Sequence, residues 1–213
     1  MKILLASATE QEVDLYRINL SKDRVDEKID LLITGIGIAS TIYNLTKSLI
    51  QTEYNMVIQA GIAGSYTDDL QTGEVVLVRE DTFADSGVEE NGIFKNLFNS
   101  GLANENDFPF EKGWLVNQNE FLNAGFLKTK KAITINKITN NKKQINQQKQ
   151  NFNADIESME GAALHYVCLQ TGIPFLQIRS ISNKVGERDK TKLEMKEAIR
   201  NLNQEVEKLL QSI

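Results

Sequence analysis

Apolar positions along the chain follow two alternating patterns. Short runs rich in branched residues predict buried strands at Lys2 to Ala6, Leu31 to Thr34, Asn55 to Gln59, Glu74 to Val78, Ala132 to Ile135 and Phe175 to Ile181. Longer stretches with apolar residues every three or four positions predict helices at Ala39 to Gln51, Glu157 to Gln170 and Lys192 to Leu210. Near-continuous apolar strands separated by helices indicate an α/β fold with a largely parallel sheet covered on both faces.

Two polar regions interrupt this alternation. Glu89 to Gly113 predicts a long surface excursion, and Asn136 to Asn153, rich in Asn, Gln and Lys, predicts a surface helix or loop. Neither region has the composition of a linker, and the chain shows no internal repeat. We therefore expect a single domain over residues 1–213.

Composition narrows the function classes. A net charge of −5 argues against a nucleic-acid binder, and no apolar run approaches the roughly 18 residues of a membrane span. One Cys (Cys168) and one His (His165) cannot supply a zinc ligand set or an internal disulfide, so no metal and no cofactor are expected. The N-terminus lacks a signal-peptide pattern, which predicts a cytoplasmic protein. We interpret His165 and Cys168 as packing residues.

Glu12 follows the first predicted strand, at the edge of the sheet where parallel α/β folds bind ligands. Thr9-x-x-Glu12 is also a capping box, in which Glu12 bonds the backbone N–H of Thr9. Glu12 is thus either a helix cap or a general base, and the local sequence does not decide between them.

Glycine pairs follow the next two strands, in Gly35-Ile36-Gly37 and in Gly61-Ile62-Ala63-Gly64. Each pair indicates either a tight turn at a helix start or a loop whose backbone N–H groups approach a ligand. Two such motifs after neighbouring strands favour one shared crevice.

Two further motifs carry polar side chains next to apolar segments. Glu157 and Glu160 open a predicted helix, where acidic residues stabilise the helix dipole or where a carboxylate accepts hydrogen bonds from a ribose diol. Met159 between them offers an apolar contact to a sugar. Asn183 ends the last strand, either as a turn residue or as an amide that pairs with a purine.

Taken in order, Glu12, GIG at 35–37, AGIAG at 60–64, ESMEGAA at 157–163 and RSISNKVGERD at 179–189 resemble the purine nucleoside phosphorylase and nucleosidase superfamily. Within it the chain is most similar to futalosine hydrolases. The resemblance implies a nucleoside phosphorylase/hydrolase-like fold with a mixed, mostly parallel sheet flanked by helices. It also implies hydrolysis of futalosine to hypoxanthine and dehypoxanthine futalosine, a step of menaquinone biosynthesis.

The resemblance assigns roles by position. Glu12 corresponds to the glutamate that activates water, Glu160 to the one that binds the ribose hydroxyls, and Met159 to a residue that packs on the sugar. Asn183 replaces the aspartate of adenine-specific nucleosidases, which favours a 6-oxopurine because an amide can pair with both O6 and N7. Further substrate contacts are implied at Ile36, Gly61, Ile62, Ala63, Ile138 and Ser158.

The glycine motifs lack the arginines and the serine with which phosphorylases of this superfamily hold phosphate, and Ile62 occupies the serine-like position. Water is therefore the expected nucleophile. Lys184 or Arg188 is a candidate cation for the acidic 5′ substituent of futalosine.

Two alternatives remain open: a methylthioadenosine/S-adenosylhomocysteine nucleosidase, and a non-catalytic nucleoside-binding protein. The resemblance also implies a homo-oligomer, a dimer or larger, in which the excursion from Phe83 to Trp114 completes a neighbour's pocket.

Overall fold

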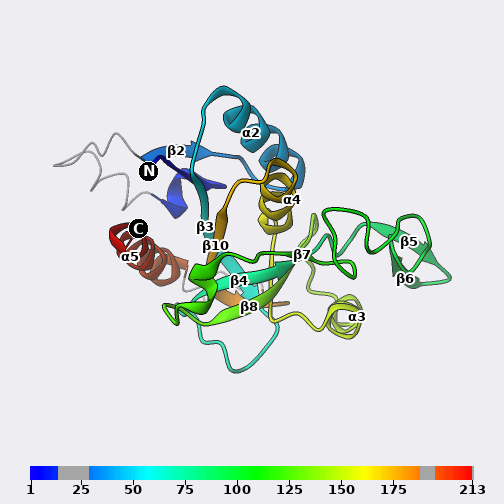
Figure 1. Cartoon of the computed structure of the whole chain (residues 1–213). Helices are drawn as coiled ribbons and strands as arrows, with labels where there is room; N and C mark the ends of the chain where they lie inside the picture. Colours follow the sequence, from blue (N-terminus) through cyan, green and yellow to red (C-terminus); the bar gives the residue numbers. More distant parts are fainter. Residues whose placement is uncertain (14–28, 188–194, 213) are drawn as a thin grey trace.

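The computed structural model describes residues 1–13, 29–187 and 195–212 (Figure 1). The strands are β1 (Ile3–Ser7), β2 (Ile29–Ile33), β3 (Met56–Ser65), β4 (Val75–Asp81), β5 (Gly87–Glu90), β6 (Ile93–Asn96), β7 (Leu115–Val116), β8 (Thr129–Thr134), β9 (Ile156–Ser158) and β10 (Phe175–Lys184). The helices are η1 (Glu10–Glu12), α2 (Ile38–Gln51), η2 (Glu120–Asn123), α3 (Lys142–Phe152), α4 (Gly161–Thr171) and α5 (Met195–Ser212).

Eight strands form one sheet with mixed pairing. β2, β1, β3 and β10 are parallel neighbours, as are β4, β8 and β9, whereas β10 pairs with β4, β3 with β9 and β4 with β7 in the antiparallel direction. Because β3 contacts both β10 and β9, the sequence β3, β10, β4, β8, β9 closes on itself. The predicted mixed, mostly parallel sheet flanked by helices is confirmed.

Helices cover both faces of the sheet, and alternating side chains of β1 show why. Ile3 and Leu5 pack in the core that α5 closes, whereas Leu4 and Ala6 pack in the core formed with α2 and α4. Figure 1 shows α5 on one side of the sheet and the α2–α4 pair on the other. Strands buried on both faces are apolar at consecutive positions, which is the pattern read from the sequence.

The packing predicted for His165 and Cys168 is confirmed, since both are fully buried on α4. The ring of His165 contacts Phe175, with centroids 4.6 Å apart, and its Nδ1 lies 2.8 Å from the carbonyl oxygen of Leu115. Burial raises the pKa of the Cys168 thiol. Both side chains belong to the core, away from the cavity described below.

Several element boundaries differ from the predictions, and two of the differences affect the site. The strand predicted to end at Gln59 continues as β3 to Ser65, so Gly61 and Gly64 lie within a strand and not in a turn. The helix predicted from Glu157 begins only at Gly161, because Ile156–Ser158 pair with both β8 and β3. In each case sheet pairing outweighs the local signal.

The two polar regions take defined structures. α3 occupies the second of them, and the first contains the β5–β6 hairpin, which extends from the body beside α3 in Figure 1. Residues 192–194 of the predicted C-terminal helix lie outside the described residues; the described part, α5, runs to Ser212. None of the described helices is long and apolar enough to cross a membrane.

Candidate active site

A cavity of about 440 Å³ opens where the carboxyl ends of β1, β3 and β10 meet the loops after β8 and β9. Its walls contain nearly all of the predicted site residues. Those that line it are Glu12, Ile36, Ile62, Ala63, Ile138, Ser158, Met159, Glu160 and Asn183. Of the predicted contacts among the described residues, Gly61 and Lys184 are not part of the lining. Tertiary structure thus brings together motifs that are up to 171 residues apart in the chain, from Glu12 to Asn183.

Glu12 is at once a helix cap and a wall of the cavity. Its Oε2 accepts hydrogen bonds from the backbone N–H and the hydroxyl of Thr9, both at 3.0 Å, and from the Ser7 hydroxyl at 3.3 Å. Its Oε1 accepts the N–H of Ile62 at 3.1 Å. On the backbone, the Glu12 carbonyl accepts a bond from Asn203 of α5. The capping interpretation is confirmed, and the same bonds hold the carboxylate against the cavity.

The first glycine motif, at residues 35–37, donates a backbone hydrogen bond to Glu160. Gly35 and Gly37 have φ of +79° and +89°, values that L side chains rarely adopt, so both positions require glycine. This turn directs the N–H of Gly37 at Glu160 Oε1, 2.9 Å away. Burial raises the pKa of the Glu160 carboxyl, whereas the Arg179 guanidinium and the Gly37 bond lower it. The motif therefore positions a cavity carboxylate through a backbone donor.

Gly61 makes room for a buried arginine. A Cβ at this position would lie 2.1 Å from Arg179 Nη1 and 3.1 Å from Glu12 Oε1. Arg179 is 1% exposed, donates from Nη2 to Gln59 Oε1 at 2.5 Å, and places Nη1 4.0 Å from Glu160 Oε2. Gly61 thus acts on the site from outside its lining, by making room for a cation 4.0 Å from the Glu160 carboxylate.

Asn183 lies in β10 at a register irregularity and not in a turn, which corrects the alternative interpretation. Its Oδ1 accepts from the Ser182 hydroxyl at 2.7 Å, and its Nδ2 donates to the Lys184 carbonyl at 2.8 Å. Since an amide has two N–H groups and two oxygen lone pairs, one donor and one acceptor remain for a ligand.

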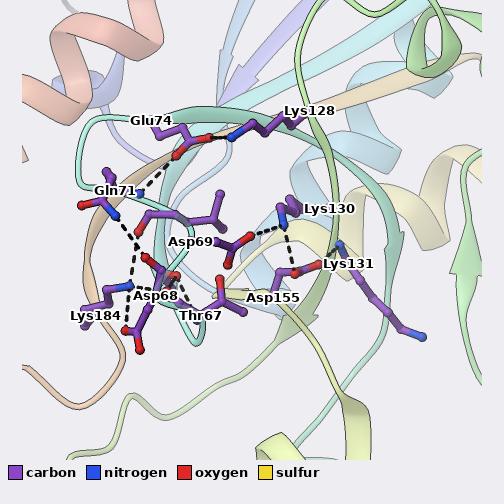
Figure 2. Close-up of polar contacts among 12 residues, drawn as sticks. Thr67, Asp68, Asp69, Gln71, Glu74, Lys128, Lys130, Lys131, Asp155 and Lys184 are labelled. Carbon is purple, nitrogen blue, oxygen red and sulfur yellow. Dashed lines mark hydrogen bonds and ion pairs between the residues drawn. The ribbon is translucent and has the colours of Figure 1, made fainter.

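The cation proposed for the 5′ substituent is not in place. Lys184 points to the β3–β4 connection, where its ammonium contacts the carbonyls of Thr67 and Leu70 and lies 3.3 Å from Asp68 Oδ1 (Figure 2). The expectation for Lys184 is therefore wrong, because local acceptors already bind its ammonium. Arg188 lies outside the described residues. Among the described residues that line the cavity there is no Lys or Arg.

Glu157 is a further carboxyl in the wall, and because it lies in β9 and does not open α4, its predicted role as a helix-dipole partner is wrong. It lies in β9, is 6% exposed, and its Oε2 is 2.5 Å from the Tyr66 hydroxyl. Burial raises the pKa of the Glu157 carboxyl to about 7, and the hydrogen bond from Tyr66 partly opposes this shift. At neutral pH a substantial fraction of Glu157 therefore carries a proton.

Sequence reasoning also missed Arg179, although it stands inside the quoted RSISN motif. The available signal was a charged residue in the middle of an apolar strand, since a buried guanidinium requires paired acceptors. The partner side chains come from β3 and the start of α4, so the pairing itself is visible only in the folded chain.

Comparisons with known proteins identify the family of the chain. The model of the Phosphorylase superfamily matches residues 11–213, and the chain belongs to that family. It is 30% identical over 183 residues to the futalosine hydrolase of Thermus thermophilus, an alignment that covers 84% of this chain and 80% of that protein. It is 26% identical over 201 residues to a 5′-methylthioadenosine/S-adenosylhomocysteine nucleosidase of Haemophilus influenzae, covering 86% of each.

Solved structures share the fold. The futalosine hydrolase of Helicobacter pylori superposes with a TM-score of 0.84 at 17% identity and covers 100% of this chain and 98% of its own. The nucleosidase of Neisseria meningitidis, solved with methylthio-immucillin-A, gives 0.84 at 18% identity with 100% and 99% coverage. The predicted superfamily and fold class are confirmed, and the named relatives are N-glycosidic bond hydrolases of the predicted type.

Proposed function

We propose that this chain is a purine nucleosidase that hydrolyses the N-glycosidic bond of futalosine, releasing hypoxanthine and dehypoxanthine futalosine for menaquinone biosynthesis. One observation carries the proposal: Glu12, Glu160 and Asn183 converge on a single cavity from η1, the start of α4 and β10. Residues 1–213 form the catalytic domain. The 30% identity to a futalosine hydrolase supports this substrate class.

The cavity offers each group that such a hydrolysis needs. Glu12, held by donors from Ser7, Thr9 and Ile62, orients a water molecule and accepts its proton. Glu160, fixed by Gly37, accepts hydrogen bonds from the ribose hydroxyls. Asn183 hydrogen-bonds the departing base. Developing positive charge at the anomeric carbon lies among carboxylates, which favours an oxocarbenium-like transition state.

Apolar residues define the rest of the substrate site. Ile62 and Met159 supply contacts for the sugar, and Ile36, Ala63 and Ile138 surround the 5′ substituent and the base. Gly61 contributes through its neighbours, and Ser158 contributes by accepting the Gly161 N–H at the start of α4, at 3.2 Å. Because no described lining residue is a Lys or Arg, a phosphate dianion has no cationic partner there. Water is the nucleophile in the proposed reaction.

A methylthioadenosine/S-adenosylhomocysteine nucleosidase is the second candidate, and the same lack of a lining cation favours it. The 5′ substituent of futalosine is acidic, whereas that of methylthioadenosine is uncharged. Asn183 opposes this candidate, since an aspartate suits the 6-amino group of adenine. A non-catalytic nucleoside-binding protein is the third candidate, disfavoured because both Glu12 and Glu160 face the cavity.

Chromatography of the base released from futalosine, inosine and methylthioadenosine, with and without phosphate, tests the three candidates. The proposal expects hypoxanthine from futalosine in phosphate-free buffer. Adenine release supports the second candidate, strict phosphate dependence makes the protein a phosphorylase, and binding without turnover supports the third.

We further propose that the protein acts in the cytoplasm as a homo-oligomer. Exposed apolar side chains support association: Ile93, Leu102 and Phe108 in the excursion and Ile36 at the cavity are 60–71% exposed. A second copy over Ile36 would close the cavity mouth. Sedimentation equilibrium tests this proposal: a monomer has a mass of 24.0 kDa, and we expect a mass at least twice as large.

A further inference from the structure

Glu157 and Asn183 stand on either side of one glycine. In the sheet, Gly64 of β3 is the register partner of Glu157 in β9 and of Asn183 in β10. The position of a Cβ on Gly64 would be 3.4 Å from Glu157 Cγ and 3.6 Å from Asn183 Nδ2. All three residues line the cavity, so the two side chains face a ligand together over a strand that has no side chain between them.

The hydrogen bonds of Glu157 leave one carboxyl oxygen for a ligand. Tyr66 OH is 2.5 Å from Oε2, and no described residue hydrogen-bonds Oε1. The same Tyr66 hydroxyl lies 3.0 Å from Gln148 Oε1, yet a hydroxyl has one proton and serves one acceptor. The shorter of the two contacts, to Glu157 Oε2, takes that proton, so Oε1 is the oxygen that can carry a proton toward a ligand.

Asn183 cannot act as the proton donor to the departing base. Breaking the glycosidic bond pushes an electron pair onto the purine, and protonation of the base assists its departure. A side-chain amide donates hydrogen bonds but does not transfer a proton at neutral pH. The nearest titratable group that shares its glycine partner is Glu157, which is buried and therefore able to remain protonated.

We propose that Glu157 is the general acid of the reaction and protonates the departing 6-oxopurine beside the hydrogen bonds of Asn183. This inference rests on the proposed purine nucleosidase function. As the C1′–N9 bond breaks, its electron pair goes to the purine and the Glu157 proton goes to N7. The water oxygen bonds C1′, and a water proton passes to Glu12. The products are hypoxanthine and a free sugar hydroxyl; Glu157 is left ionised and Glu12 protonated, and proton exchange with solvent restores both.

The pH dependence of kcat reports the protonation of the general acid. Other titratable and charged groups near Glu157 can affect this dependence. Among the described residues these are Tyr66, Lys149, whose Nζ is 5.9 Å from the Tyr66 ring centroid, and the cavity carboxyls Glu12, Glu160 and Glu187. Loss of the Glu157 proton lowers kcat on the alkaline side, with a midpoint near pH 7.

The test is the pH profile of hypoxanthine release from futalosine by the wild type and three variants. Glu157→Gln keeps the shape and the hydrogen-bonding capacity but has no transferable proton. We expect kcat to fall about 10²–10⁴-fold with KM within about threefold, and the alkaline limb to disappear. Tyr66→Phe removes a bond that favours the ionised carboxyl, so its alkaline limb moves to higher pH. Glu187→Gln, the matched control for cavity charge, keeps the limb.

Each result has one interpretation. A Glu157→Gln enzyme with wild-type kcat, or one with only a raised KM, overturns the proposal and leaves Glu157 as a binding or structural residue. If Glu157→Gln does not fold, an alkaline limb that is unmoved in Tyr66→Phe overturns it. A wild type that releases no base from futalosine, inosine or methylthioadenosine overturns the proposed function and the inference together, and is recognised before any variant is made.

Discussion

Substituting Gly61 by alanine tests whether the buried arginine organises this site. The added methyl carbon would lie 2.1 Å from Arg179 Nη1, whereas ordinary contacts begin near 3.4 Å. The guanidinium therefore has to retreat by roughly 1 Å or more. Its surroundings are fully buried, so retreat means loss of the 2.5 Å bond to Gln59 and of the contact with Glu160.

The magnitude follows from these two losses. A hydrogen bond to a buried charged group contributes about 1.5–3 kcal/mol, and over-packing a core costs about 1–3 kcal/mol. We therefore expect Gly61→Ala to lower the free energy of unfolding by about 2–5 kcal/mol. Activity falls by about 10²-fold in kcat/KM, because a displacement of 1 Å is enough to misplace Glu160 and Glu12 relative to the substrate.

Urea unfolding and base-release kinetics measure the two effects, and a double-mutant cycle identifies their origin. In an Arg179→Met background the side chain reaches only as far as the Nε position, so the clash partner is absent. The cost of adding the methyl group at Gly61 should then drop below about 1 kcal/mol. The reasoning is refuted if Gly61→Ala alone is within about 0.5 kcal/mol of wild type with normal turnover, or if the two changes are additive.

Three further outcomes follow from the structure. Glu12→Gln should lower kcat by about 10²–10⁴-fold while calorimetry still detects substrate binding, and a normal rate would remove Glu12 from the mechanism. Asn183→Asp should raise the rate of adenine release relative to hypoxanthine release when two nucleosides that differ only in the base are compared. An unchanged ratio would contradict the base-recognition argument. Burial lowers the pKa of His165 to about 4, so its unfolded state binds more protons between about pH 4 and 6.5 and this residue adds stability as pH rises through that window. Urea denaturation of the wild type and of His165→Asn across this range should show a difference in the free energy of unfolding that grows by about 3 kcal/mol as pH rises. The comparison with the variant is needed because burial raises the pKa of Asp81 to about 7, which gives a pH dependence of stability of the opposite sign.

Much of the fold could be read from local sequence because it depends on local patterns. Each β1 residue from Ile3 to Ala6 is apolar since both faces of the sheet are covered, and the α2 and α5 stripes repeat at helical spacing because each helix buries one side. The turn at Gly35 and Gly37 also follows from the sequence, since only glycine adopts those φ values readily.

The site could be predicted only in part. The family resemblance predicted the roles of Glu12, Glu160 and Asn183, because each of them lies in a short motif of consecutive residues. It did not show that Gly61 exists to admit Arg179, that Lys184 is bound by Asp68, or that Glu157 faces Asn183. Each of these facts depends on a partner from another element.

The sequence by itself determined the class of fold, six of the strands, the helices α2, α4 and α5 and the superfamily, because hydrophobic periodicity and short motifs act over a few neighbouring residues. Tertiary structure alone decided that the strand at Gln59 continues through Gly64, since pairing with β10 and β9 stabilises an extended backbone there. That continuation sets Glu157 beside Asn183 and Arg179 behind Gly61. Charge pairing and burial are properties of neighbours in space, and so the protonation chemistry of the site appears only in the folded chain.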